Sequence, residues 1–132
     1  IDVAIVTVHI GANDAVTDGE ATYVPKEKYG ENLTAIIKML KEYTPNAKIV
    51  LLGPPPVDEK MWQETSKKMT GGRKDGRQRS HERNLAYSQV AGQAAKAGGV
   101  AFLDMCHKLK YEFGGMMMEM RDSALAGIVW AK

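Results

Sequence analysis

Apolar residues in this chain follow two different periods, and the two alternate along the sequence. Residues 2–10 are dense in valine and isoleucine with little polar alternation, which is typical of a parallel strand buried on both faces. Residues 25–43 then place apolar side chains three and four positions apart, which predicts an amphipathic helix that begins near Pro25. A short apolar run over 48–53, ended by Pro54, Pro55 and Pro56, predicts a second strand.

The later part of the chain continues this alternation. Residues 57–69 have a weakly helical pattern, whereas residues 70–79 are glycine-rich and basic without periodicity and therefore predict a loop. Ser80 is a suitable N-cap for a helix through Lys96, which Gly98 and Gly99 end before a third strand over 100–103. This order predicts an α/β fold, a three-layer sandwich around a central parallel sheet of flavodoxin-like type.

Composition narrows the class of protein. A chain of 132 residues with 44% hydrophobic residues and a net charge of +2 is typical of one soluble globular domain, here spanning residues 1–132. The single cysteine, Cys106, excludes an internal disulfide framework and favours an intracellular, reducing compartment. No apolar run approaches the roughly 20 residues of a membrane-spanning helix, and no signal peptide is recognisable.

The candidate chemistry begins at the end of the first predicted strand, with Gly11, Ala12, Asn13 and Asp14. Functional residues of open parallel sheets lie just beyond the carboxyl ends of the strands, so the position suits a site. Gly, Asn and Asp are also the ordinary residues of a tight turn. The tetrapeptide alone leaves both interpretations open.

The surrounding residues carry a family resemblance. The segment from His9 to Ala15, then Val24-Pro25 with Tyr29 and Asn32-Leu33, and the proline-rich strand end through Asp58 resemble the SGNH/GDSL hydrolases. The likeness is strongest to the isoamyl acetate-hydrolysing esterase group, whose later helix resembles the segment that contains Arg79-Ser80, Glu82 and Ala86-Tyr87-Ser88. The resemblance extends to about Leu109.

This resemblance implies a serine esterase acting on small acyl esters without a cofactor. Asn13 matches the family asparagine that donates its side-chain amide to the oxyanion, with Gly11 and Asp14 forming the turn around it. An amide donor aimed at developing negative charge typically contributes a factor of about a hundred to a thousand in rate.

The chain also departs from the family pattern. The family's glycine-aspartate-serine nucleophile block and its glycine donor block precede the first segment matched here, so we expect a domain lacking its N-terminal strand and helix and its C-terminal block. None of the serines present follows a strand in the required context, and each is expected to be a cap or a surface hydroxyl. These serines are Ser66, Ser80, Ser88 and Ser123.

The family's terminal aspartate-x-x-histidine block has two counterparts. Asp104 and His107 have the right spacing but directly follow the third strand, one element too early, so we interpret this pair as coincidental. The colinear match is Asp122 as the terminal acid, with Leu125 where the histidine belongs. Leucine cannot accept a proton, so the triad fails in that register.

The remaining imidazoles and charges have simpler interpretations. His9 is expected to be a structural histidine inside the first strand, and His81 a solvent-exposed one. No pair of histidines or carboxylates has the spacing of a metal site, so we expect no metal. The basic loop Lys67–Arg83 is interpreted as a solvated loop or as a surface for an anionic partner. Its basic members are Lys67, Lys68, Arg73, Lys74, Arg77, Arg79 and Arg83.

Three hypotheses of function follow. The first is an ester hydrolase domain that is inactive as these 132 residues alone, because the nucleophile and the matched histidine are missing. The second is a catalytically dead structural subunit of a larger multiprotein assembly. The third is binding of an anionic partner through the basic loop, with nucleic acid disfavoured because interleaved aromatic residues are lacking.

Overall fold

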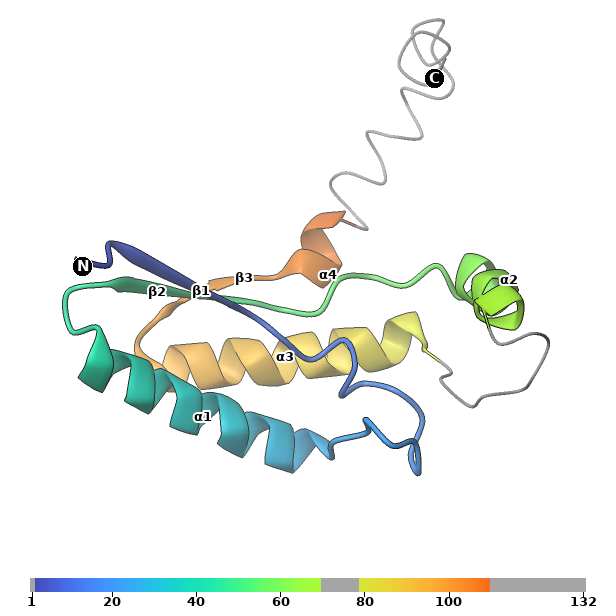
Figure 1. The fold of residues 1–132 in the computed structure, drawn as a ribbon, viewed down its shortest axis with the longest axis horizontal. Coiled ribbons are helices and arrows are strands. Elements are labelled where there is room, and N and C mark those ends of the chain that lie inside the picture. Colours follow the sequence, from blue (N-terminus) through green and yellow to red (C-terminus); the bar gives the residue numbers. More distant parts are fainter. Residues whose placement is uncertain (1, 70–78, 110–132) are drawn as a thin grey trace, which may run out of the picture.

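The computed structural model describes residues 2–69 and 79–109, which form a small sheet with helices packed beneath it (Figure 1). Residues 110–132, with Asp122, Ser123 and Leu125, lie outside the described residues, as do residues 70–78 of the predicted basic loop. The elements in chain order are β1 (Ile5–His9), α1 (Lys26–Tyr43), β2 (Lys48–Leu52), α2 (Glu59–Met69), α3 (His81–Gly98), β3 (Ala101–Leu103) and α4 (Met105–His107).

The three strands form one parallel sheet in the order β1-β2-β3. Ile5 pairs with Lys48 and His9 with Leu52, while Leu52 also pairs with Leu103 on the other side. All three strands therefore end at the same edge of the sheet, and the segments that follow them emerge together there. The predicted α/β fold with a parallel sheet, present in incomplete form, is confirmed.

Two long helices cover one face of this sheet. Figure 1 shows α1 and α3 side by side beneath the strands, and both contribute to one apolar core. On α1, apolar side chains recur at helical spacing, and three of them, Tyr29, Leu33 and Ile37, are buried in this core. Each fully buried aliphatic side chain of this size stabilises the fold by about 1.5–3 kcal/mol. The rest of the buried cluster is Ala15, Leu51, Tyr87, Ala91, Ala94 and Ala95.

The opposite face of the sheet is open within the described part of the chain. Residues of β1 alternate between exposed and half-buried, and Ile5 is 60% exposed. The prediction of a strand buried on both faces is therefore wrong for β1, because the described helices pack on one face only. The dense valine and isoleucine content of this segment does not distinguish the two cases. His9, expected inside the strand, is exposed.

The helix ends follow the sequence closely. Ser80 accepts a hydrogen bond from the backbone N–H of Arg83 and is the N-cap of α3, as predicted. Gly99 ends α3 in the left-handed conformation, with φ of +60°. No helix among the described residues is long and apolar enough to span a membrane.

Candidate active site

The turn after β1 is fixed by its contacts with α1 and with the strand end of β2. Gly11 has φ of +114°, a conformation that side chains of L-residues rarely adopt. A Cβ atom there would lie 2.5 Å from Oη of Tyr29 and 2.9 Å from Cγ of Pro54. Tyr29 Oη also donates to the carbonyl of Ile10 at 3.1 Å. Gly11 is therefore needed for both its backbone conformation and its lack of a side chain.

Asn13 lies in this turn, beyond the carboxyl end of β1, and its side chain is exposed. Its Oδ1 accepts a hydrogen bond from Nη2 of Arg79, and Arg79 Nη1 donates to the carbonyl of Ala12 at 2.7 Å. None of the described residues hydrogen-bonds to Nδ2 of Asn13. The turn therefore presents an amide donor that is available to a ligand. β1 itself is an edge strand of the described sheet, with β2 at its centre.

A second arginine holds the next part of the same loop. Arg83 Nη1 donates to the carbonyl of Val16 at 3.0 Å and to Oδ1 of Asp18 at 2.8 Å. This hydrogen bond, more than the charge of the guanidinium, lowers the pKa of the exposed Asp18 carboxyl. Arg79 and Arg83, both members of the basic loop, thus form hydrogen bonds to residues 12–18 of their own domain. Lys67 and Lys68 are exposed, and Arg73, Lys74 and Arg77 lie outside the described residues.

Two buried tyrosines pack against each other, and Tyr29 also contacts the turn. The rings of Tyr29 and Tyr87 pack with centroids 5.2 Å apart, and Tyr87 Oη donates to the carbonyl of Val24. Burial, with the nearby Asp14 carboxylate adding to it, raises the pKa of Tyr29 above its usual range. Burial also raises the pKa of Tyr87 to about 12. Both phenols therefore remain neutral hydrogen-bond donors at physiological pH.

These pKa shifts predict a loss of stability in alkali. Above about pH 10 the unfolded tyrosines lose their protons while the folded Tyr29 keeps its own, so the folded chain binds more protons. The free energy of unfolding should fall by about 1.4 kcal/mol per pH unit for this residue. Urea unfolding at a series of pH values should show a shallower decline for Tyr29→Phe. Tyr43→Phe is the matched control, because Tyr43 is 80% exposed, and an equal effect of both changes would contradict the assignment.

The Asp104 and His107 pair is joined through the backbone. Asp104 Oδ1 accepts from the backbone N–H of His107 at 3.0 Å and from Oγ of Ser88 at 2.9 Å. The carboxylate is the N-cap of α4, which explains the aspartate-x-x-histidine spacing without catalysis. The colinear candidates Asp122 and Leu125 lie outside the described residues, so their roles remain predictions.

The described serines all have structural contacts. Ser80 caps α3, Ser88 is fully buried against Asp104, and Ser66 donates to the carbonyl of Gln63. His81 was expected to be exposed, but it is half-buried, with Nδ1 3.7 Å from Sγ of the buried Cys106. The prediction missed this because α4 folds back onto the start of α3. Within residues 2–69 and 79–109, no group of three potential ligands could hold a metal ion.

The sequence predicted that Asn13 lies just beyond the end of the first strand, but it did not predict that Arg79 contacts Asn13. Arg79 also lies over the ring of Trp62 from α2, 4.7 Å from the ring centroid. The contact with Asn13 joins residues 66 positions apart, so no local sequence pattern predicts it. The one usable signal was the position of Arg79 directly before the N-cap of α3, in a segment already singled out by resemblance.

Comparison with known proteins identifies the family of the chain. The sequence profile of the GDSL-like Lipase/Acylhydrolase family matches residues 1–125. An Arabidopsis thaliana protein named GDSL esterase/lipase is 31% identical over 108 residues, which cover 79% of this chain and 45% of that protein. A second Arabidopsis protein so named is 42% identical over 59 residues, covering 42% of this chain and 24% of that protein.

The chain therefore belongs to the GDSL-like Lipase/Acylhydrolase family, which confirms the resemblance to the SGNH/GDSL hydrolases. It spans less than half the length of these two curated relatives.

Proposed function

We propose that residues 11–14 form the oxyanion hole of a carboxylic ester hydrolase, with Nδ2 of Asn13 as a donor. The observation that carries this proposal is the hydrogen bonding of the Asn13 side chain. Its oxygen is bound by Arg79, while its amide nitrogen has no partner among the described residues and lies beyond a strand end. A donor held in this way stabilises negative charge that develops on a carbonyl oxygen during acyl transfer.

The substrate of this proposed site is a small acyl ester, as in the isoamyl acetate-hydrolysing group that the sequence resembles. The two Arabidopsis relatives are named esterase/lipase, which is compatible with this substrate class. Asp122 is the proposed terminal acid. No cofactor is needed, because an acyl transfer of this kind uses a nucleophile, a base and oxyanion donors.

The 132 residues alone are proposed to be inactive. An oxyanion donor stabilises a transition state that forms only after a nucleophile attacks, so Asn13 cannot act without one. Ser66, Ser80 and Ser88 are engaged in structural contacts, and Ser88 is inaccessible to an ester. In the register that assigns Asp122 as the terminal acid, position 125 carries leucine in place of the family's histidine.

A fluorophosphonate probe tests this proposal, because it labels only an activated serine. The 132-residue polypeptide and the complete gene product that carries these residues should be compared, each with p-nitrophenyl acetate hydrolysis as the second measurement. We expect no labelling and no hydrolysis above a protein-free control for the 132 residues. Labelling and hydrolysis by the gene product would support the hydrolase and would show that a residue other than Leu125 supplies the base. Labelling of Ser123 in the 132 residues, lost on His107→Ala, would instead identify Asp104 and His107 as the functional pair.

A structural subunit is the second candidate function. The observation in its favour is the open face of the sheet, where Ile5 and Leu103 are 60% and 38% exposed. A gene product that neither hydrolyses the ester nor reacts with the probe would support this role over the hydrolase. The anionic-partner hypothesis is weakened, because Arg79 and Arg83 are bound within the domain.

A further inference from the structure

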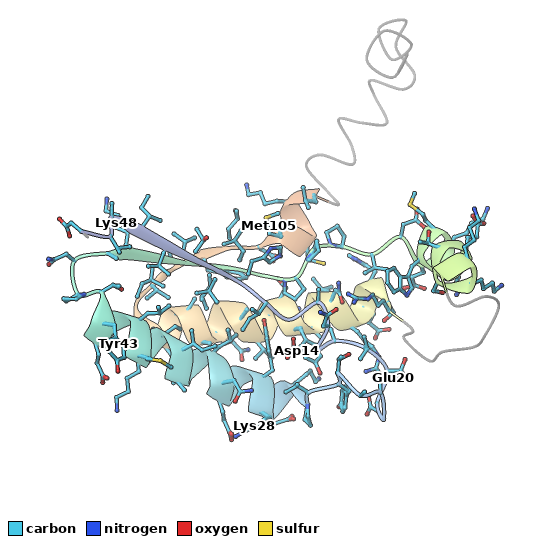
Figure 2. The ribbon with its side chains drawn as sticks, in the orientation of Figure 1. Asp14, Glu20, Lys28, Tyr43, Lys48 and Met105 are labelled. Atoms are coloured by element: carbon cyan, nitrogen blue, oxygen red, sulfur yellow. The ribbon has the colours of Figure 1, made fainter. Side chains whose placement is uncertain are left out.

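Arg79 binds the candidate oxyanion turn at two points. One guanidinium nitrogen donates to the carbonyl of Ala12 and the other to Oδ1 of Asn13. The guanidinium also stacks on the ring of Trp62, and the residue directly precedes the N-cap Ser80. Arg79 is thus held from α2 on one side and from the start of α3 on the other, while it contacts the turn that carries Asn13. Figure 2 shows Asp14 and Glu20 in the half of the molecule away from Tyr43 and Lys48, the half in which Figure 1 places α2.

This contact decides which way the Asn13 amide points. The oxygen and the NH₂ group of a carboxamide have nearly the same shape, so packing alone does not distinguish the two orientations. A guanidinium has five N–H donors and no acceptor, so only the oxygen of the amide can face it. The NH₂ group must therefore occupy the other position. In the reverse orientation an acceptor would face the developing oxyanion and repel it.

We propose that Arg79 is a positioning residue that fixes the Asn13 carboxamide with its N–H bonds directed to the oxyanion. The inference rests on the proposed function, since it assigns a role to Arg79 within the same site. The positive charge of Arg79 adds to the effect, because a hydrogen bond to Oδ1 polarises the amide and strengthens its N–H groups as donors. Arg79 itself acts through Asn13 and does not touch the substrate.

A purely structural role for Arg79 is the competing interpretation, and Arg83 is its matched control. Arg83 also donates to one backbone carbonyl and one side-chain oxygen of the same loop, those of Val16 and Asp18. Within the described residues it makes no hydrogen bond to Asn13. Arg79→Met and Arg83→Met therefore remove the same charge and the same kind of tether, and only the first change should affect the Asn13 amide.

The decisive measurement is NMR relaxation of the Asn13 side-chain Nδ2 in the ¹⁵N-labelled 132-residue protein, with Asn13→Asp used to assign the signal. A fixed amide should have an order parameter near that of rigid groups, about 0.85, and Arg79→Met should lower it below about 0.6. Arg79→Lys, which keeps a donor, should restore part of the order, and Arg83→Met should leave it unchanged. An Asn13 amide as ordered in Arg79→Met as in the original chain would overturn the proposal.

Two further readouts keep the test decisive. If Arg79→Met does not fold, Trp62→Leu removes the stacking contact and leaves the guanidinium in place, and a fall in Asn13 order in that folded variant supports the proposal. In a catalytically active gene product, Arg79→Met should lower kcat with little change in KM, and adding it to Asn13→Ala should cause no further loss. If Arg79→Met lowered kcat by the same factor with Asn13 present and with Asn13→Ala, the proposal would be overturned. Loss of Asn13 order without any ester hydrolysis would instead count against the proposed function and leave the orienting contact established.

Discussion

Asn13→Ala is expected to lower kcat for p-nitrophenyl acetate by about a hundred- to a thousandfold in a catalytically active gene product that carries these residues. The lost group is a donor to charge that exists only in the transition state, so KM should change little. The side chain is exposed, and its hydrogen bond from Arg79 is on the surface, so the free energy of unfolding should fall by no more than about 1 kcal/mol. Steady-state kinetics together with urea unfolding measure the two effects separately.

Asn13→Asp sharpens this experiment. The carboxylate has nearly the shape of the amide and keeps an oxygen for Arg79, but it replaces the donor with a negatively charged acceptor. The loss of kcat should therefore equal or exceed that of the alanine variant. Asn46→Ala is the control, because Asn46 lies in the exposed turn before β2, at the opposite end of the sheet. Retention of activity by Asn13→Asp would show that Asn13 is not an oxyanion donor.

Gly11→Ala should cause a large loss of stability. A non-glycine residue at φ of +114° costs about 1–3 kcal/mol, and forcing a methyl group into a filled space typically costs another 1–3 kcal/mol. The new Cβ would lie 2.5 Å from Tyr29 Oη and 2.9 Å from Pro54 Cγ. Roughly 2–6 kcal/mol is a large part of the 5–15 kcal/mol that stabilises an ordinary domain. Urea or thermal unfolding should show it directly.

Gly19→Ala separates the two causes of this loss. Gly19 also has a positive φ, of +90°, but a Cβ atom there would have nothing within 4 Å. Its substitution should therefore cost only the backbone part, about 1–3 kcal/mol. If Gly11→Ala is no more destabilising than Gly19→Ala, the packing of the turn against Tyr29 and Pro54 is looser than the structure describes.

The elements of this fold were predictable because their signals are local. The helical period from Tyr29 onward, the cap at Ser80 and the glycines after α3 each act within a few residues, and each was confirmed. The position of Asn13 followed from the rule that sites lie beyond parallel strand ends. Which faces of a strand other elements cover was not predictable in the same way. The prediction that β1 is buried on both faces was wrong. Valine and isoleucine suit a strand whether one or both faces are covered.

The contacts that complete the candidate site are the part that sequence did not reveal. Arg79 and Arg83 were grouped with the basic loop because charge clusters look alike in sequence. Each instead reaches across more than sixty residues to the turn after β1. Similarly, the spacing of Asp104 and His107 fits a catalytic pair and a helix cap equally well, and only the hydrogen bond to the backbone N–H distinguishes them.

The edge position of β1 has a consequence for how an oxyanion hole could work here. In the described sheet β1 has a neighbouring strand on one side only, so its pairing alone cannot immobilise the turn that follows it. The turn is held instead by Tyr29 from α1, by Arg79 just before the N-cap of α3 and by Arg83 in the first turn of α3. These contacts would supply the low reorganisation energy on which electrostatic catalysis depends, because dipoles fixed in advance need not rotate when charge develops. Catalytic power at Asn13 would then be a property of helix packing as much as of the strand that carries it.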